Sequence, residues 1–558
     1  MPILNEREHT NLLTRQLIHY CPEALDGYKL RDMGGDGCTL CSELQLLELL
    51  QDELTRKTAQ LRVKINQSHS TINRKLPPEI LATIFQACVE DPSYYNSFEA
   101  ADPPASFPPP PFLLGAVCRT WRDIAWSTPR LWSSITIHLD YRPDRHAIQR
   151  TLAEEWLGRA GQLPLSIRLV ADLHHRGTDI QLLQPLVGLI NQYSPRWWNL
   201  DLDTPACIFP WFRPVGNRAP MLECLKVNER HHFLNSDSTG SDNPDILDLG
   251  DTPSLKYMST RRISLHKLRV DWGALTHFCG ESMSDSEGLE VLRRAPLLEY
   301  GSFHTLSGSS DPSEFPSIPI VTQNLRTVAL TFPNRNGAFF MDNLTCPALE
   351  TLSVIGPSSG HLSSFFRRSE FTLKSLSVTF FEEDLKRLSE LLREQPSIVE
   401  LKLGWSGYLN DLLNELTMPE VETDAAPLLP NLETLEFMGI ARDFKWEKFV
   451  QIFPNMALRD ASSAQSKGRL QRPWRNIKTT LIQDEAFSPG RGGLPYIPEY
   501  LLSQLQLVIA RGIELDLKVT SGVDTVNAKD WIKVSEEWHQ VQRETAAAKV
   551  SPGFIFAF

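Results

Sequence analysis

The sequence predicts an α+β multidomain protein, in which a small helical unit precedes an α/β repeat array with a parallel sheet. Two observations predict this division. Short amphipathic segments bounded by prolines fill residues 71–135, and a recurring apolar phrase fills residues 136–520. A flexible leader at 1–36, an amphipathic helix at 37–70, and a capping helix with a tail at 521–558 complete the expected organisation.

The repeat array is predicted from the phrase apolar-x-x-apolar-x-apolar. The phrase starts at Leu325, Leu349, Leu373 and Ile398, so its successive starts lie 24, 24 and 25 residues apart. This is the period of leucine-rich repeats, in which each short strand turns its apolar residues inward and a return segment brings the chain back. The spacing therefore predicts a degenerate solenoid with a parallel sheet, and a conventional α/β domain is the alternative.

The same phrase recurs at looser spacing elsewhere in the array. Further starts are Leu222, Leu265, Leu298 and Leu432. We expect residues 163–170 to open the array and residues 513–519 to close it. Three polar, turn-rich segments are predicted as loops: residues 229–253, 302–319 and 456–496.

The amphipathic helix at 37–70 has leucines spaced by seven. Leu40, Leu47, Leu54 and Leu61 occupy one position of a heptad, whereas the second seam position alternates between apolar and polar residues. The pattern favours a marginal coiled coil. A helix packed against its own chain is the alternative, and the sequence leaves open whether the helix dimerises.

Two further helices are predicted in the segment 71–135. Pro77 and Pro78 followed by Glu79 form a favourable helix start, because proline lacks an N–H that the first turn would leave unpaired. The prolines of residues 92–111 favour an extended spacer. A second helix over 112–125 follows, and alternating apolar residues from Ile135 predict a strand.

These residues carry a family resemblance. The ordered set LPPEIL…IF, VCRTWRDIA and TPRLW, from Leu76 to Trp132, resembles an F-box of the type abundant in mushroom-forming fungi. The resemblance implies a three-helix unit that binds a Skp1-like protein and, through it, a cullin-based ubiquitin ligase. The contact residues that it implies are Leu76, Pro77, Ile80, Leu81, Ile84, Phe85, Val117, Cys118 and Trp121.

Composition narrows the classes of partner. The chain has 558 residues, and its 56 basic and 68 acidic side chains give a net charge of −12, which offers no general attraction to nucleic acid or anionic membranes. No apolar run reaches the length of about 20 residues that a membrane-spanning helix needs. Nine dispersed cysteines and the lack of a secretory pattern favour the cytoplasm or the nucleus.

The sequence predicts no enzyme. Cys38-x-x-Cys41 has metal-ligand spacing but lacks a second pair, and no nucleophile or phosphate-loop motif is complete, so we expect no cofactor and no metal. The prediction is a substrate adaptor of a Skp1–cullin–F-box ligase, whose repeat array binds an unknown target protein. The alternative is a scaffold for protein–protein interaction that acts without a ligase.

Overall fold

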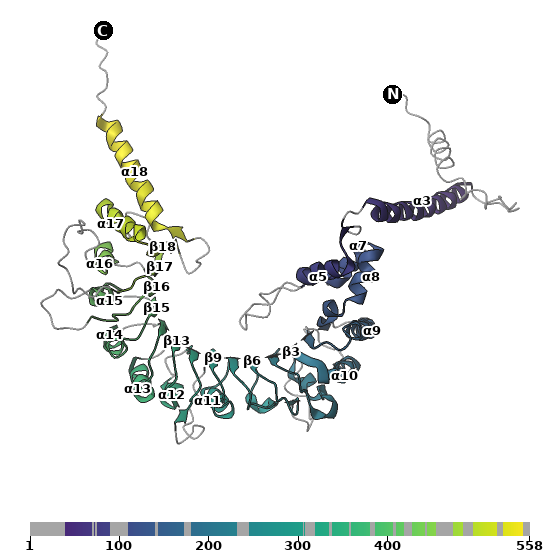
Figure 1. Cartoon of the computed structure of the whole chain (residues 1–558), viewed down its shortest axis with the longest axis horizontal. Helices are drawn as coiled ribbons and strands as arrows, with labels where there is room; N and C mark the ends of the chain where they lie inside the picture. Colours follow the sequence, from purple (N-terminus) through teal and green to yellow (C-terminus); the bar gives the residue numbers. More distant parts are fainter. Residues whose placement is uncertain are drawn as a thin grey trace, which may run out of the picture. The chain divides into compact units, whose positions relative to one another are not determined.

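A computed structural model divides the chain into two compact units, Met1–Trp132 and Ser133–Phe558 (Figure 1). The sequence placed this boundary after residue 135; in the structure, the strand that contains Ile135 belongs to the second unit. The structure describes residues 39–69, 72, 75–89, 110–139, 143–171, 180–230, 245–304, 306, 319–333, 338–356, 359–379, 385–405, 409–417, 427–440, 444–453, 472–483, 495–521 and 528–550. The predicted leader at 1–36 and most of the predicted proline-rich spacer lie outside these residues.

The first unit is helical among its described residues. Its helices are α3 (Thr39–His69), α5 (Pro78–Val89), α7 (Pro110–Val117), α8 (Arg119–Ser127) and the short 3₁₀ helix η1 (Pro129–Trp132). Helix α3 matches the helix predicted for 37–70, and α5 begins at the predicted proline pair. The single helix predicted for 112–125 is instead two helices that meet at Cys118, where the backbone is extended and the thiol accepts a hydrogen bond from the Trp121 N–H.

Aromatic residues form the core of α5, α7, α8 and η1. Phe85 of α5 is buried and packs on Trp121, with ring centroids 4.8 Å apart. The Trp132 indole is also buried, and its Nε1 donates a 2.8 Å hydrogen bond to the carbonyl of Ala125. Gly115 is required where α7 crosses α8, because a Cβ there would lie 2.1 Å from the Trp126 ring. These contacts fix which faces of the helices remain outside.

The second unit is a mixed α/β structure built on one large, mostly parallel sheet. Fifteen described strands follow one another across this sheet in chain order, and only the last pair is antiparallel. The strands are β1 (Ser134–Leu139), β2 (Leu165–Ala171), β3 (Trp197–Thr204), β4 (Cys224–Glu229), β6 (Tyr257–Arg261), β8 (His277–Glu281), β9 (Tyr300–His304), β11 (Thr327–Thr331), β13 (Thr351–Ile355), β14 (Ser375–Thr379), β15 (Glu400–Trp405), β16 (Thr434–Ile440), β17 (Asn476–Gln483), β18 (Glu514–Ser521) and β19 (Lys529–Asp530).

Helices connect many of these strands and lie along one side of the sheet (Figure 1). They are α9 (Pro143–Arg159), α10 (Gln184–Gln192), α11 (Asp285–Arg294), α12 (Ala338–Asp342), α13 (Ser359–Ser369), α14 (Leu385–Arg393), α15 (Leu409–Leu416), α16 (Trp446–Gln451), α17 (Glu499–Ala510) and α18 (Trp531–Val550). The 3₁₀ helices of the unit are η2 (Ile180–Leu183), η3 (Ser194–Arg196), η4 (Ala206–Trp211), η5 (Val215–Asn217) and η6 (Leu265–Lys267). Two small parallel sheets pair β5 (Leu247–Asp248) with β7 (Leu268–Arg269) and β10 (Ile320–Val321) with β12 (Leu344–Thr345).

The apolar phrase places its residues in the core, as predicted. Around β11, the side chains of Leu325, Val328 and Leu330 are buried, and the corresponding residues around β13, β14 and β15 are buried too. The register of the sheet aligns Val328 with Leu352 and Leu376 on the next strands. Because side chains alternate along a strand, the intervening residues lie on the opposite side of the sheet.

Three predictions about the array were wrong in detail. The phrase from Leu265 forms η6 and β7, outside the large sheet, whereas β6 and β8 on either side of it are strands of that sheet. In β6 and β8 the last apolar position of the phrase is occupied by Thr260 and Gly280, so the phrase did not identify these two strands. The segment 163–170 does not open the sheet, since β1 precedes it. The segments predicted as loops contain strand residues: β5 lies within 229–253, the end of β9 within 302–319, and β17 within 456–496.

The C-terminal helix packs on the end of the sheet through its first turns. Trp531 of α18 is buried, and its ring and that of Trp538 both stack on Tyr496, at 5.5 and 4.7 Å between centroids. The short strand β19, just before α18, pairs with β18 in the antiparallel direction. Val541, which the sequence placed on the same apolar stripe, is exposed, so the packed part of the helix is its N-terminal part.

One buried acid in the second unit predicts a pH-dependent stability. Asp285 begins α11 with no exposed surface, and neither of its carboxyl oxygens has a hydrogen-bond partner among the described residues. Burial raises the pKa of this carboxyl from 3.8 to about 6. Between these two pH values the folded state keeps a proton that the unfolded state releases, so the free energy of unfolding falls as the pH rises.

We expect Asp285→Asn to remove this pH dependence, because the amide stays neutral. At pH 7 the variant should be more stable by up to about 3 kcal/mol, the free-energy equivalent of a pKa shift of about two units. Urea unfolding below pH 4 and at pH 7 measures the difference. Asp251→Asn, at an exposed carboxylate, is the control and should change little. Equal stabilisation at both pH values would contradict the assignment.

Candidate binding surfaces

The helices of the first unit expose two apolar stripes. On α5, Ile80 and Ile84 are 48% and 42% exposed, and on α7, Leu113 and Val117 are 49% and 53% exposed. In each pair the residues are four apart, so they lie on one face of their helix. The adjacent face of α5 carries the buried Leu81 and Phe85, so the core contacts described above hold the stripe outward.

The structure places the nine predicted contact residues in three environments. Leu81 and Phe85 are buried in the core of the unit; Leu76, Cys118 and Trp121 are half-buried; Pro77, Ile80, Ile84 and Val117 are exposed. Leu81 and Phe85 therefore belong to the core beneath the surface, and Cys118 caps the N-terminus of α8. The sequence analysis missed Leu113, although its spacing of four from Val117 on the same helix is a sequence signal for a shared face.

A second surface is the side of the large sheet opposite the buried core residues. We call it the open face and define it as the strand positions in register with Thr327, Ala329 and Thr331. These positions are half-buried in β11, whereas Val328 and Leu330 between them are buried. The parallel register aligns equivalent positions on neighbouring strands, so the open face consists of rows of side chains that cross the sheet.

One part of the open face is an aromatic row. Tyr257, His277 and Tyr300 are aligned by the register of β6, β8 and β9. The ring centroids are 4.7 Å apart between Tyr257 and His277 and 5.8 Å apart between His277 and Tyr300. All three rings are half-buried, so they keep accessible surface beside one another. Rigid aromatic side chains with a polar edge are common anchors of protein interfaces.

Polar groups border the aromatic row on the same strands. Arg261 and Glu281 form an ion pair at 3.0 Å. His304 bridges two hydroxyl groups: its Nε2 is 2.7 Å from Ser302 Oγ, and its Nδ1 is 3.1 Å from Thr331 Oγ1. Burial lowers the pKa of His277, and the nearby Glu299 opposes this effect. The row is therefore an apolar patch with polar groups beside it.

Charges elsewhere on the open face are paired within the sheet. Near one end, Asp203 accepts hydrogen bonds from Arg230 at 2.7 Å and from Asn228 at 2.8 Å. Toward the other end, Lys402 lies 3.1 Å from Glu400 and 3.8 Å from Glu436. The Glu400 hydrogen bond raises the pKa of Lys402. Because these positive and negative charges lie close together, they do not form a region of one sign that would attract a polyanion or a polycation.

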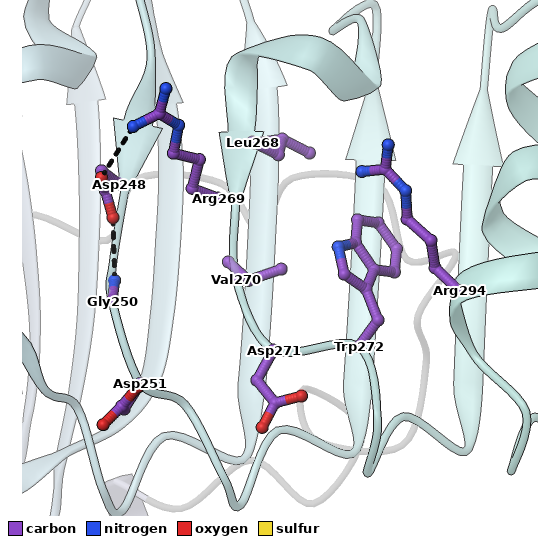
Figure 2. A pocket seen from close by; sticks show the side chains of 9 residues that line it. All are labelled: Asp248, Gly250, Asp251, Leu268, Arg269, Val270, Asp271, Trp272 and Arg294. Atoms are coloured by element: carbon purple, nitrogen blue, oxygen red, sulfur yellow. Dashed lines mark hydrogen bonds and ion pairs between the residues drawn. The ribbon is translucent and has the colours of Figure 1, made fainter.

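A shallow pocket of about 550 Å³ lies beside the small β5–β7 sheet (Figure 2). Arg269 is 3.5 Å from Asp248, and Asp248 also accepts a hydrogen bond from the Gly250 N–H. Trp272 and Arg294 form part of the lining. Acidic and basic groups pair within the pocket, so it has no concentrated charge of one sign for a small anionic or cationic ligand.

Three cysteine thiols of the second unit have raised pKa values. Burial raises the pKa of the Cys207 and Cys224 thiols to about 11 and that of Cys346 to about 12, which is opposite to the shift of a reactive thiolate. Among the described residues, no cluster of three or more His, Cys, Asp and Glu side chains is arranged to hold a metal ion. Cys38 lies outside them.

Comparisons with known proteins add no family: no family model matches the sequence, and no curated protein matches it significantly. None of the described helices combines the length and the apolar character needed to cross a lipid bilayer.

We expect the imidazole of His277 to titrate below its usual pKa of 6.5, because burial disfavours its charged form. Glu299→Gln should lower this pKa further, since it removes a negative charge that favours the imidazolium. NMR titration of histidine-labelled protein measures both values, and His277→Gln assigns the resonance. A pKa of His277 above 6.5, or an upward shift in the Glu299→Gln variant, would refute the proposed environment.

Proposed function

We propose that this chain is a substrate adaptor of a Skp1–cullin–F-box ubiquitin ligase. The single observation that carries the proposal is the exposed apolar stripe of Ile80 and Ile84, within the segment whose sequence resembles an F-box. In the proposed mechanism the first unit binds a Skp1-like protein, which recruits a cullin. Catalysis resides in other subunits, and the proposed location is the cytoplasm or the nucleus.

The energetics of the stripe support a docking role. Leaving an isoleucine side chain in water instead of burying it costs about 1.5–3 kcal/mol, and α5 and α7 expose four large apolar residues. The core of the unit is already filled by residues such as Phe85 and Trp132. The exposed residues are thus available to an outside partner, and aliphatic anchors of this kind dominate standard interfaces.

We further propose that the second unit is a degenerate leucine-rich-repeat solenoid that binds the target. The chain-order parallel sheet and the buried residues at intervals of 24 or 25 support this assignment. The aromatic row of Tyr257, His277 and Tyr300 is the proposed anchor for the target. Joining the two binding surfaces in one chain raises the local concentration of the target at the ligase.

The test replaces the stripe on α5. Ile80→Asp with Ile84→Asp should weaken binding of a purified Skp1-like protein by roughly 100-fold or more, because two anchors worth about 1.5 kcal/mol or more each are lost and charges enter an apolar interface. The matched control is Ile148→Asp with Leu152→Asp, a pair of exposed residues with the same spacing on α9. Titration calorimetry measures both affinities.

Leu81 and Phe85 are unsuitable for this test, because replacing either would disrupt the core. If the folded wild type fails to bind any Skp1-like protein, the adaptor proposal is wrong, and a ligase-independent scaffold becomes the better account of the open face. Equal loss of binding in the α9 control would show that charge, and not the α5 stripe, governs the interaction.

A further inference from the structure

Helix α3 exposes a long apolar face. The residues that share this face, Leu44, Leu47, Leu54, Leu61 and Ile65, are between 49% and 58% exposed. Leu46, Leu49 and Val63 are also exposed but lie on other sides of the helix. Leu47, Leu54 and Leu61 occupy one heptad position, and Leu44 and Ile65 belong to the other. The alternative considered from the sequence, a helix whose leucines pack against the same chain, does not agree with this exposure.

The two halves of α3 carry charges of opposite sign. Between residues 44 and 53 the ionisable side chains are all acidic: Glu48, Asp52 and Glu53. Between residues 56 and 65 they are all basic: Arg56, Lys57, Arg62 and Lys64. Glu53 and Arg56 form an exposed hydrogen-bonded pair at 2.7 Å, but such local pairs contribute little and do not cancel the division.

We propose that α3 pairs with α3 of a second copy of this chain, in antiparallel orientation. In this arrangement the acidic half of each helix lies along the basic half of its partner. The heptad seam then places Leu44 opposite Leu61 of the second copy, and Leu47 opposite Thr58. The occupant is another copy because the helix itself carries both complementary charge patterns and the seven-residue period of a helix pair.

The charges select the orientation. A parallel pair would align acidic half with acidic half and would place Lys57 of each helix beside Arg62 of the other, at flanking heptad positions. Like charges at such positions destabilise a coiled coil, whereas the antiparallel pair brings opposite signs together. The polar seam residues Gln51 and Thr58 limit the stability of the pair, so we expect a reversible dimer.

Self-association is tested on the full-length protein by sedimentation velocity and light scattering. The wild type should approach twice its mass of 63.3 kDa as its concentration rises. Leu47→Asp with Leu54→Asp should restore the monomer mass, whereas the α9 control, Ile148→Asp with Leu152→Asp, should dimerise like the wild type. A wild type that stays monomeric at every concentration, or a seam variant that still dimerises, overturns the proposal.

Orientation is tested by disulfide trapping. A mixture of Leu47→Cys and Thr58→Cys proteins, one of them enlarged by a fusion tag, should give a mixed disulfide dimer above the wild-type background. Thr58→Cys alone should give none, because two copies of residue 58 would lie about 16 Å apart along an antiparallel pair, too far for a disulfide. Efficient cross-linking of Thr58→Cys to itself would establish a parallel pair and overturn the antiparallel assignment. This proposal is independent of Skp1 binding, so either can fail alone.

Discussion

The second unit depends on one constraint: up to β18, each strand of the large sheet pairs in parallel with the next strand of that sheet. A tight turn cannot connect two parallel strands. After each strand, a return segment must therefore bring the chain back to the edge of the sheet where the next strand begins. In the regular part of the sheet, this return and the strand together take 24 or 25 residues. Buried strand residues pack against the return helices, as Phe303 of β9 does against Phe340 of α12, with ring centroids 5.4 Å apart. The repeat period of the sequence is therefore the combined length of one strand and one return segment.

The same constraint creates the open face. Register aligns equivalent residues of successive strands, so any residue type repeated at equivalent strand positions becomes a row across the sheet. Tyr257, His277 and Tyr300 stack because three consecutive strands carry a ring at the same position. The ion pairs that cross strands, such as Arg261 with Glu281, arise in the same way. The core side of each strand is restricted to apolar side chains, while the open face is free to vary, so that face can acquire binding specificity without loss of packing.

Sequence patterns predicted the sheet where all three apolar positions of a strand are filled, as in β11 and β13. They failed where Thr260 and Gly280 occupy the third position, because the burial of such residues depends on neighbouring strands that the local pattern does not contain. For the first unit, the pattern found the correct helix α5 but could not decide which of its apolar residues face outward. Ile80 and Leu81 are adjacent and similar in character, and only packing against α7, α8 and η1 separates the exposed one from the buried one.

The division of exposed apolar surface between elements follows from packing. The return helices of the second unit cover one side of its sheet and bury leucines such as Leu388 and Leu392 of α14, although α9 keeps Ile148 and Leu152 exposed. Among its described residues the first unit has no strand, so its helices have no sheet to cover there. Helix α5 buries one side and keeps the stripe of Ile80 and Ile84, and α3 keeps most of its leucines exposed. Since exposed stripes of this size are costly in water, their presence on two different helices argues for two separate partners. The charge pattern of α3 matches a second copy of itself, whereas the stripe of α5 is aliphatic and uncharged. A single partner for both helices would have to satisfy these two unlike surfaces together.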